Sequence, residues 1–364
     1  MPDWTKSMQQ TFEYYIVDPG TWKDSSRIST VKTSTIDRDS EVETLGSATM
    51  DITESLGECY VRTYLITIQN GIREKHPLGT FLVQTPSSSF DGRVQNLSID
   101  AYTPLIELKE NSPNIGYYIP KGENVLDIAY QITRDHVRAP VVKTENSTKN
   151  YSDYVADTAD SWLTFLSDFI GNHTYERTSS NDAPTTYQFD LDEMGRILFS
   201  PKQDLSALQP VWTYDDGNSS ILYPEVSLER DLYGIPNVVE VVYSSATANY
   251  HVRVVNDDPN SPVSTVSRGR EIIYRDLSPL ITGDPTKAQV ESYAKKILQN
   301  MSTVKCTISY THGYCPVRLG DCVRLNYARA GLIDIKAKVI SQSIKCEPGC
   351  PVTEKAVFTK NLWR

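Results

Sequence analysis

Short segments rich in β-branched and aromatic residues recur along this 364-residue chain, and they constrain its fold more than any other feature. Residues 11–17 and 60–68 are two such segments, bounded by Gly, Asn, Asp or Pro. Asn70-Gly71 and Asp91-Gly92 are strong signals for short hairpin turns. The pattern therefore predicts antiparallel strands joined by tight turns.

Residues 1–111 are predicted to form a first β domain, an antiparallel barrel or sandwich. In its strand at 60–68, Thr63 and Leu65 are expected on one face, and Arg62 and Tyr64 on the other. Its further strands are expected at 27–36, 46–52, 78–85 and 93–101. A short helical corner is expected at 104–111, before a linker at 111–114.

Residues 112–225 are predicted to be an inserted α+β domain. The apolar spacing of Val125, Ile128, Ala129 and Ile132 predicts a helix over 123–137. A second helix follows a cap at Asp160 or Ser161 and ends at Gly171-Asn172. A hairpin is expected from 187–191 and 196–199, with its turn at 192–195.

Residues 226–364 are predicted to form a second β domain with one helix. That helix spans 285–300, with Asp284 as its cap and Pro285 in its first position. The strands are expected at 237–244, 250–256, 270–275, 303–311, 320–327, 333–345 and 353–360. The expected fold class is mainly β, with two antiparallel barrel or sandwich domains flanking a small mixed insert.

Composition excludes several classes of protein. Hydrophobic residues make up 39% of the chain and charged residues 23%, which is typical of a globular protein. No apolar run is long enough for a transmembrane helix, and the first residues lack the apolar core of a signal peptide, so synthesis in the cytoplasm is expected. The net charge of −10 disfavours tight binding of nucleic acid. It fits either simple solubility or a surface past which DNA slides.

Five of the six cysteines lie near the C-terminal end, and their role is open between three readings. His312, Cys315, Cys322, Cys346 and Cys350 would supply metal ligands, although the spacing is not that of paired Cys-x-x-Cys motifs. A disulfide is the second reading, and Cys346 and Cys350 flank a Glu-Pro-Gly turn. Free thiols on strands, as for Cys306, are the favoured reading, and no metal or cofactor is expected.

Catalytic motifs are not evident, and the chain is expected not to be an enzyme. It has no Gly-x-Ser-x-Gly motif, and its five histidines are scattered. Asp190, Asp192 and Glu193, or the Asp215-Asp216 pair, would suit a glycosidase, but they lie in turn-like contexts where Asp is favoured for backbone reasons. Asp257-Asp258 with Asn260 resembles part of a calcium loop, and a simple loop tip is the favoured interpretation.

Several segments, in order, resemble the tail-tip or baseplate hub proteins of tailed bacteriophages. The segment with Leu78-Gly79-Thr80-Phe81 carries the resemblance most clearly. A LysM-like insert is indicated by the stretch around Tyr117–Val125, and its role is either structural or glycan-binding. The other segments are Ser34–Asp39, Gly46–Met50, Ile99–Leu105, Tyr233–Val239 and Asp257–Pro262.

The resemblance implies two tube-like β domains per subunit and a homotrimeric ring. Such a ring closes the tail tube, seats the tip or spike and lets DNA pass at infection. The implied partners are other copies of the chain, the distal tail or tail tube protein ring, the tape-measure protein and tip, spike or fibre proteins. DNA is contacted only in transit, no stable membrane insertion is expected, and the location is the virion.

Receptor binding and lysis are expected from separate proteins, because the chain ends at Asn361–Arg364 directly after its last predicted strand. Two other readings stay open. One is a cell-wall hydrolase or adhesin of a phage tail, and the other is the hub of a contractile injection particle.

Overall fold

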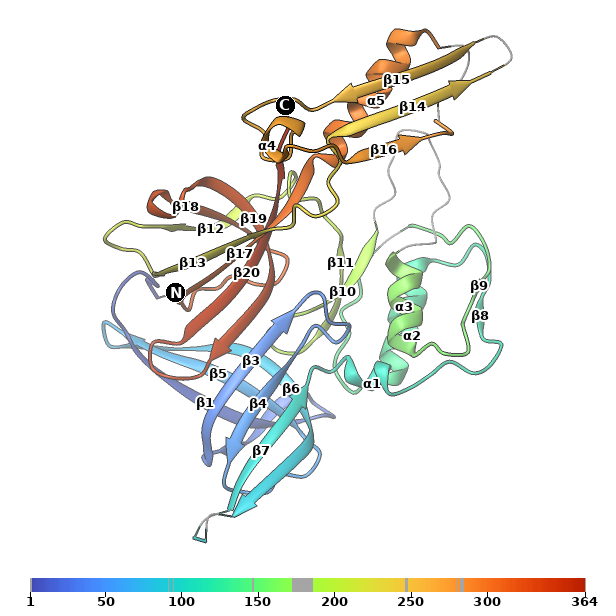
Figure 1. Cartoon of the computed structure of the whole chain (residues 1–364). Helices are drawn as coiled ribbons and strands as arrows, with labels where there is room; N and C mark the ends of the chain where they lie inside the picture. The colour runs from blue at the N-terminus through green and yellow to red at the C-terminus, as the bar shows by residue number, and fades with distance from the viewer. Residues whose placement is uncertain are drawn as a thin grey trace. The chain divides into compact units, whose positions relative to one another are not determined.

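The computed structural model describes residues 2–90, 92–93, 95–145, 147–171, 186–245, 248–279, 281 and 285–363. The chain divides into two compact units (Figure 1). Unit 1 comprises Met1–Glu225 and Tyr310–Lys355, and unit 2 comprises Val226–Ser309 and Ala356–Arg364. Each is described by itself.

Seven antiparallel strands form the first β region of unit 1, in the spatial order β3-β4-β7-β6-β5-β1-β2. The strand β5 lies between β6 and β1 in this order, and Tyr60 to Thr67 are buried on both of its faces. Its turn at Asn70-Gly71 has positive φ at both residues, as the sequence predicts for a short hairpin. The strands are β1 Gln9–Asp18, β2 Lys23–Ile28, β3 Val31–Asp39, β4 Gly46–Ile52, β5 Tyr60–Gln69, β6 Ile72–Phe90 and β7 Gln95–Tyr102.

The insert of unit 1 shares one hydrophobic core with the first β region. Val17, Tyr60 and Leu82 from the strands pack in the same cluster as helices α2 and α3. Asn124 caps α2, and Ser161, rather than Asp160, accepts the backbone N–H of Thr164 at the start of α3. The elements are α1 Ile106–Lys109, β8 Tyr118–Ile119, α2 Val125–His136, β9 Tyr154–Val155, α3 Trp162–Gly171, β10 Tyr187–Leu191 and β11 Ile197–Pro201.

The second β region joins the first through a seam of paired strands. Residues Ser341–Lys345 of β19 pair antiparallel with Thr35–Asp39 of β3. The path of strands ends at β2 on one side and β13 on the other, so the described strands form an open sheet rather than a closed barrel. The further strands are β12 Pro210–Asp215, β13 Leu222–Arg230, β17 Thr303–Gly313, β18 Cys322–Tyr327, β19 Leu332–Lys345 and β20 Pro351–Asn361, with a 3₁₀ turn, η1, at Ala328–Ala330.

Unit 2 places helix α5 against a three-stranded sheet. Val290, Ala294 and Leu298 form the buried face of α5 and pack with Val239 and Val241. The order of strands is β15-β14-β16. The elements are β14 Val238–Ser244, β15 Asn249–Val255, α4 Thr265–Arg268, β16 Ile273–Asp276 and α5 Lys287–Met301.

The mainly β fold class is confirmed, with corrections to single elements. The strand expected at 27–36 is two strands, β2 and β3, and β12 and β13 were not expected at all. The cap of α5 is Thr286, whose side chain forms a capping box with Gln289. Asp284, the expected cap, lies outside the described residues, as do Asp91 and Asn172. No helix in the described ranges is long and apolar enough to cross a membrane.

Candidate functional site

The turn of the β10–β11 hairpin lies at the junction of the insert and the first β region. Asp192 shapes the turn, because its carboxylate accepts the backbone N–H groups of Met194 (3.0 Å) and Arg196 (2.8 Å). Gly195 has φ +75°, and a Cβ placed there would lie 2.6 Å from the Cβ of Thr80. Only glycine fits this close approach of the turn to strand β6.

Three side chains of the first β region donate hydrogen bonds to one carbonyl oxygen of this turn. The indole N–H of Trp22 (2.8 Å), the hydroxyl of Thr80 (3.0 Å) and the guanidinium of Arg62 (3.1 Å) all reach the carbonyl oxygen of Met194. Because the groups are largely buried, each bond contributes more than it would in water. These contacts hold the insert in one position on the sheet.

Arg62 is 1% exposed, so its charge needs partners inside the protein. Its Nη1 donates to Asp24 (2.9 Å), and its Nε donates to the Thr80 hydroxyl (2.8 Å). Tyr64, expected on the same face of β5 as Arg62, also donates to Asp24 (2.9 Å), and β5 is covered on both faces. Sequence alone missed Arg62, Trp22 and Met194 as a group, since an Arg within an apolar strand was the only signal.

A second buried network crosses the seam between the two β regions. Arg38 of β3 donates to the carbonyl oxygen of Leu78 (2.6 Å) and to Oε1 of Gln342 on β19 (3.1 Å). Gln342 then donates through Nε2 to Glu354 of β20 (2.7 Å). Glu354 also accepts a hydrogen bond from the Tyr310 hydroxyl. A continuous chain of polar side chains therefore joins β3, β19, β20 and β17.

His312 ends this network, with both ring nitrogens facing acceptors. Its Nδ1 lies 2.8 Å from the carbonyl oxygen of Gly313, and its Nε2 lies 3.5 Å from a carboxylate oxygen of Glu354. Burial alone lowers the pKa of His312. The hydrogen bonds to Cys315 and Glu354, with the charge of Glu354, outweigh burial and raise the pKa to about 10. The arrangement fits an imidazolium that stabilises a buried carboxylate.

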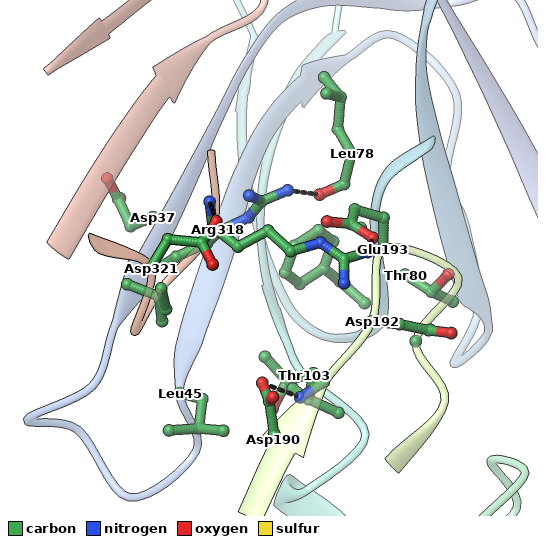
Figure 2. Close-up of a pocket in the computed structure, with 16 residues that line it drawn as sticks. Asp37, Leu45, Leu78, Thr80, Thr103, Asp190, Asp192, Glu193, Arg318 and Asp321 are labelled. Carbon is green, nitrogen blue, oxygen red and sulfur yellow. Dashed lines mark hydrogen bonds and ion pairs between the residues drawn. The ribbon is translucent and has the colours of Figure 1, made fainter. Parts of the chain in front are cut away.

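A cavity of about 170 Å³ lies between the hairpin turn, β3, β6 and the 318–321 segment. Figure 2 shows Arg318 extending across it toward Glu193, with which it forms an ion pair, while Asp37 and Asp321 lie on the other side. Burial raises the pKa of Asp321. The cavity has room for a few water molecules.

The carboxylates considered for glycoside hydrolysis have structural partners. Asp190 accepts the Ser200 hydroxyl (2.8 Å), Asp192 holds the turn, and Glu193 pairs with Arg318. Asp215 accepts the backbone N–H of Gly217 (3.0 Å). Asp258 likewise accepts the backbone N–H of Asn260 (2.8 Å) within its own loop. The turn interpretation of the sequence holds for Asp192 and Asp215, whereas Asp190 lies within β10. Asp258 shapes a loop as expected.

The C-terminal cysteines do not gather at one place that would hold a metal ion. Among the described residues, no group of three or more His, Cys, Asp or Glu side chains is arranged for one. Cys315 lies 3.3 Å from the Tyr214 hydroxyl and 3.9 Å from Nδ1 of His312, so the structure brings these two predicted candidates together. Cys306, Cys315, Cys322 and Cys350 are buried, Cys346 is half-buried, and all have free thiols.

The chain resembles solved tail proteins over almost its whole length. No family model and no curated protein sequence matches it. The tail protein from Neisseria meningitidis MC58 is 15% identical, with a TM-score of 0.56 over 97% of this chain and 98% of that one. The 43 kDa tail protein of prophage MuSo2 from Shewanella oneidensis is 10% identical, with a TM-score of 0.57 over 95% and 98%.

A chain of the Francisella PdpA–VgrG complex, in its half-lidded form, is also similar. It is 10% identical, with a TM-score of 0.53 over 97% of this chain and 58% of that one. At such low sequence identity the comparisons show a shared fold and nothing further. The chain therefore has the fold of phage tail proteins, as the order of its sequence segments predicted.

Proposed function

We propose that this chain is a structural hub protein at the tip of a phage tail. In this proposal three copies form a ring that closes the tail tube, seats the tip or spike, and lets DNA pass at infection. The observation that carries it is the fold shared with two phage tail proteins over 95–97% of this chain and 98% of theirs.

The open sheet supports a ring built from several copies. The seam between β3 and β19 joins the two β regions edge to edge, and β2 is left as an end strand within the described part of the chain. An unpaired strand edge is a ready site for pairing with another chain. Further copies would cover these edges, and the buried networks would keep each subunit rigid.

The net charge of −10 supports a passage that does not retain DNA. The proposed partners are other copies of the chain, a distal tail or tail tube protein ring, the tape-measure protein, and tip, spike or fibre proteins. The ranges 1–111, 112–225 and 226–364 are proposed as the first tube-like domain, the insert and the second tube-like domain. The proposed location is the virion, after assembly in the bacterial cytoplasm.

A non-catalytic role is part of the proposal. Cys315, His312 and Glu354 lie together, but they are 0–2% exposed, so no substrate reaches them in the folded protein. The carboxylates of the hairpin turn are engaged in backbone and ion-pair contacts. Both sets of contacts support structural roles over the hydrolase alternative.

A hub of a contractile injection particle is a second candidate, favoured by the similarity to a chain of the Francisella PdpA–VgrG complex. Neighbouring genes separate the two candidates. A major capsid gene beside the gene for this chain supports the phage reading, whereas injection-particle genes without a capsid gene support the other.

Native mass spectrometry of the purified chain tests the ring. The proposal predicts a species of three times 41.0 kDa that persists on dilution to low micromolar concentration. A strictly monomeric chain at every concentration, also in the presence of its tail tube partner, would contradict the trimer. Release of sugar or peptide from purified cell walls would contradict the non-catalytic role.

A further inference from the structure

The turn between β19 and β20 brings two cysteines to the ends of paired strands. β19 ends at Lys345 and β20 begins at Pro351, and the two strands are neighbours in the sheet. The backbone N–H of Cys350 donates to the carbonyl oxygen of Glu347 (2.8 Å), which closes a tight turn. Gly349 and Cys350 have φ of +90° and +41°. Cys346 and Cys350 therefore stand on either side of a three-residue reversal.

The two residues differ in exposure, and Cys346 is the more exposed of the pair. Cys346 is half-buried, and its backbone N–H donates to the carbonyl oxygen of Ser34 on β3 (2.9 Å). Cys350 is fully buried. Burial raises the pKa of Cys350, and the negative charge of a Cys346 thiolate adds to that increase.

We propose that Cys346 and Cys350 are an oxidisable pair that forms a disulfide across the β19–β20 turn. Residues that flank a three-residue turn between neighbouring strands are held near one another, as the Cα separation of a disulfide requires. The other C-terminal cysteines are placed differently, since Cys306 lies within β17 and Cys322 within β18. The bridge would fix the turn next to the seam between β19 and β3.

The oxidant is a small-molecule disulfide, such as glutathione disulfide. The thiolate of Cys346, the more exposed residue of the pair, attacks one sulfur of the oxidant and releases one thiol. The thiolate of Cys350 then attacks the sulfur of Cys346 in this mixed disulfide and releases the second thiol. Two protein thiols are thus oxidised to one disulfide, and one small-molecule disulfide is reduced to two thiols.

Peptide mapping of the folded, full-length protein tests this assignment. The protein is incubated with glutathione disulfide and then denatured in the presence of iodoacetamide, which alkylates the remaining thiols. Trypsin digestion follows. Cleavage after Lys345 and Lys355 puts both cysteines in the single peptide 346–355, while Cys306 and Cys315 share peptide 306–318. We expect peptide 346–355 to be two hydrogen masses lighter and unalkylated, with Cys306, Cys315 and Cys322 alkylated.

Two variants sharpen the result. Cys322→Ser leaves both proposed partners in place, so it is expected to form the bridge as the native chain does. Cys350→Ser removes the second nucleophile and is expected to accumulate glutathione on Cys346. In the native chain, a doubly alkylated peptide 346–355, or a lasting glutathione adduct on Cys346, would overturn the proposal.

The pH dependence separates reaction of the folded protein from reaction of unfolded chains. Burial raises the pKa of Cys346 to about 12, whereas an exposed thiol has a pKa near 8.5. The rate of bridge formation in the folded protein is therefore expected to keep rising, by about tenfold per pH unit, beyond pH 9. A rate that levels off near pH 8.5 would show that only unfolded chains react.

Discussion

At the residue scale, the carbonyl oxygen of Met194 accepts three hydrogen bonds that help to position the insert. Its three donors, Trp22, Thr80 and Arg62, come from different strands or turns of the first β region. Arg62 matters most, because a buried guanidinium without partners is far more costly than a lost neutral hydrogen bond. These polar contacts therefore act together with the hydrophobic core that the insert shares with the strands.

Replacing Arg62 by Ala is expected to lower the free energy of unfolding by about 3–5 kcal/mol. The change removes the buried guanidinium that pairs with Asp24 and takes one donor from Met194. Arg27→Ala is the matched control, because Arg27 is 56% exposed and pairs with Glu13, so a loss below about 1 kcal/mol is expected. Urea unfolding of both variants measures the difference, and equal losses would contradict the assigned role.

Gly195→Ala is expected to destabilise the protein by about 1–3 kcal/mol. The new Cβ would meet Thr80, and the positive φ is unfavourable for alanine. Gly57→Ala is the control, since nothing lies within 4 Å of an added Cβ there. Thermal unfolding that shows no difference between the two variants would argue against the close approach of turn and strand.

Alkaline pH is expected to weaken the second network. The pKa of His312 is raised from 6.5 to about 10 in the folded protein, so between these values only the folded chain holds the proton. The contribution of His312 to the free energy of unfolding is fully present below pH 6.5. It falls as the pH rises toward 10, by on the order of 1 kcal/mol per pH unit.

Comparison of variants isolates this contribution. His312→Gln removes the titrating group, so its stability is expected to vary less between pH 6.5 and 8 than that of the native chain. His251→Gln, at an exposed position of unit 2, should keep the native slope. Denaturant unfolding at several pH values makes the comparison, and identical slopes for all three proteins would contradict the imidazolium.

At the element scale, the seam between β3 and β19 joins the first β region to the second. Ile36 and Ile344 face each other across it, and both are fully buried. The polar chain from Arg38 through Gln342 to Glu354 crosses the same strands. Main-chain pairing, apolar packing and buried hydrogen bonds therefore act on one short stretch.

Ile344→Ala tests the seam directly. Removal of a fully buried Ile side chain is expected to cost about 2–5 kcal/mol. Ile333→Ala changes the same residue type in the same strand, but Ile333 is 68% exposed, so little change is expected. Denaturant midpoints compare the two variants, and a small effect of Ile344→Ala would show that the seam contributes little to stability.

The sequence predicted most elements because their signals are local. Periodic apolar residues identified α2 and α3, and Asn70-Gly71 identified a hairpin. β12 was missed because its pairing partner, β18, lies about a hundred residues away in the chain. The carboxylates of the hairpin turn were interpreted well, since Asp at turns is a local preference.

Local sequence patterns did not predict the hydrogen-bond networks at the junction and at the seam. Arg62 and Met194 are 132 residues apart, and Arg38 and Gln342 are 304 apart. Their proximity follows from tertiary pairing alone, which a single sequence does not display. The fold was predicted instead from the order of the segments that resemble phage tail hub proteins.

At the scale of the whole molecule, the proposed ring explains why the described strands form an open sheet and why the chain is acidic. Edge strands such as β2 would be covered by neighbouring copies, and the acidic charge would let DNA pass. The similarity to phage tail proteins places this fold among proteins of tail particles. The central claim is therefore the position and number of copies in the particle.

Electron cryomicroscopy of the particle that carries the chain tests this claim most directly. The account predicts three copies in a ring at the tip of the tail, around a lumen not lined by Lys and Arg. Copies along the tail shaft, a single copy at the side of the tip, or a lumen lined with Lys and Arg would contradict it.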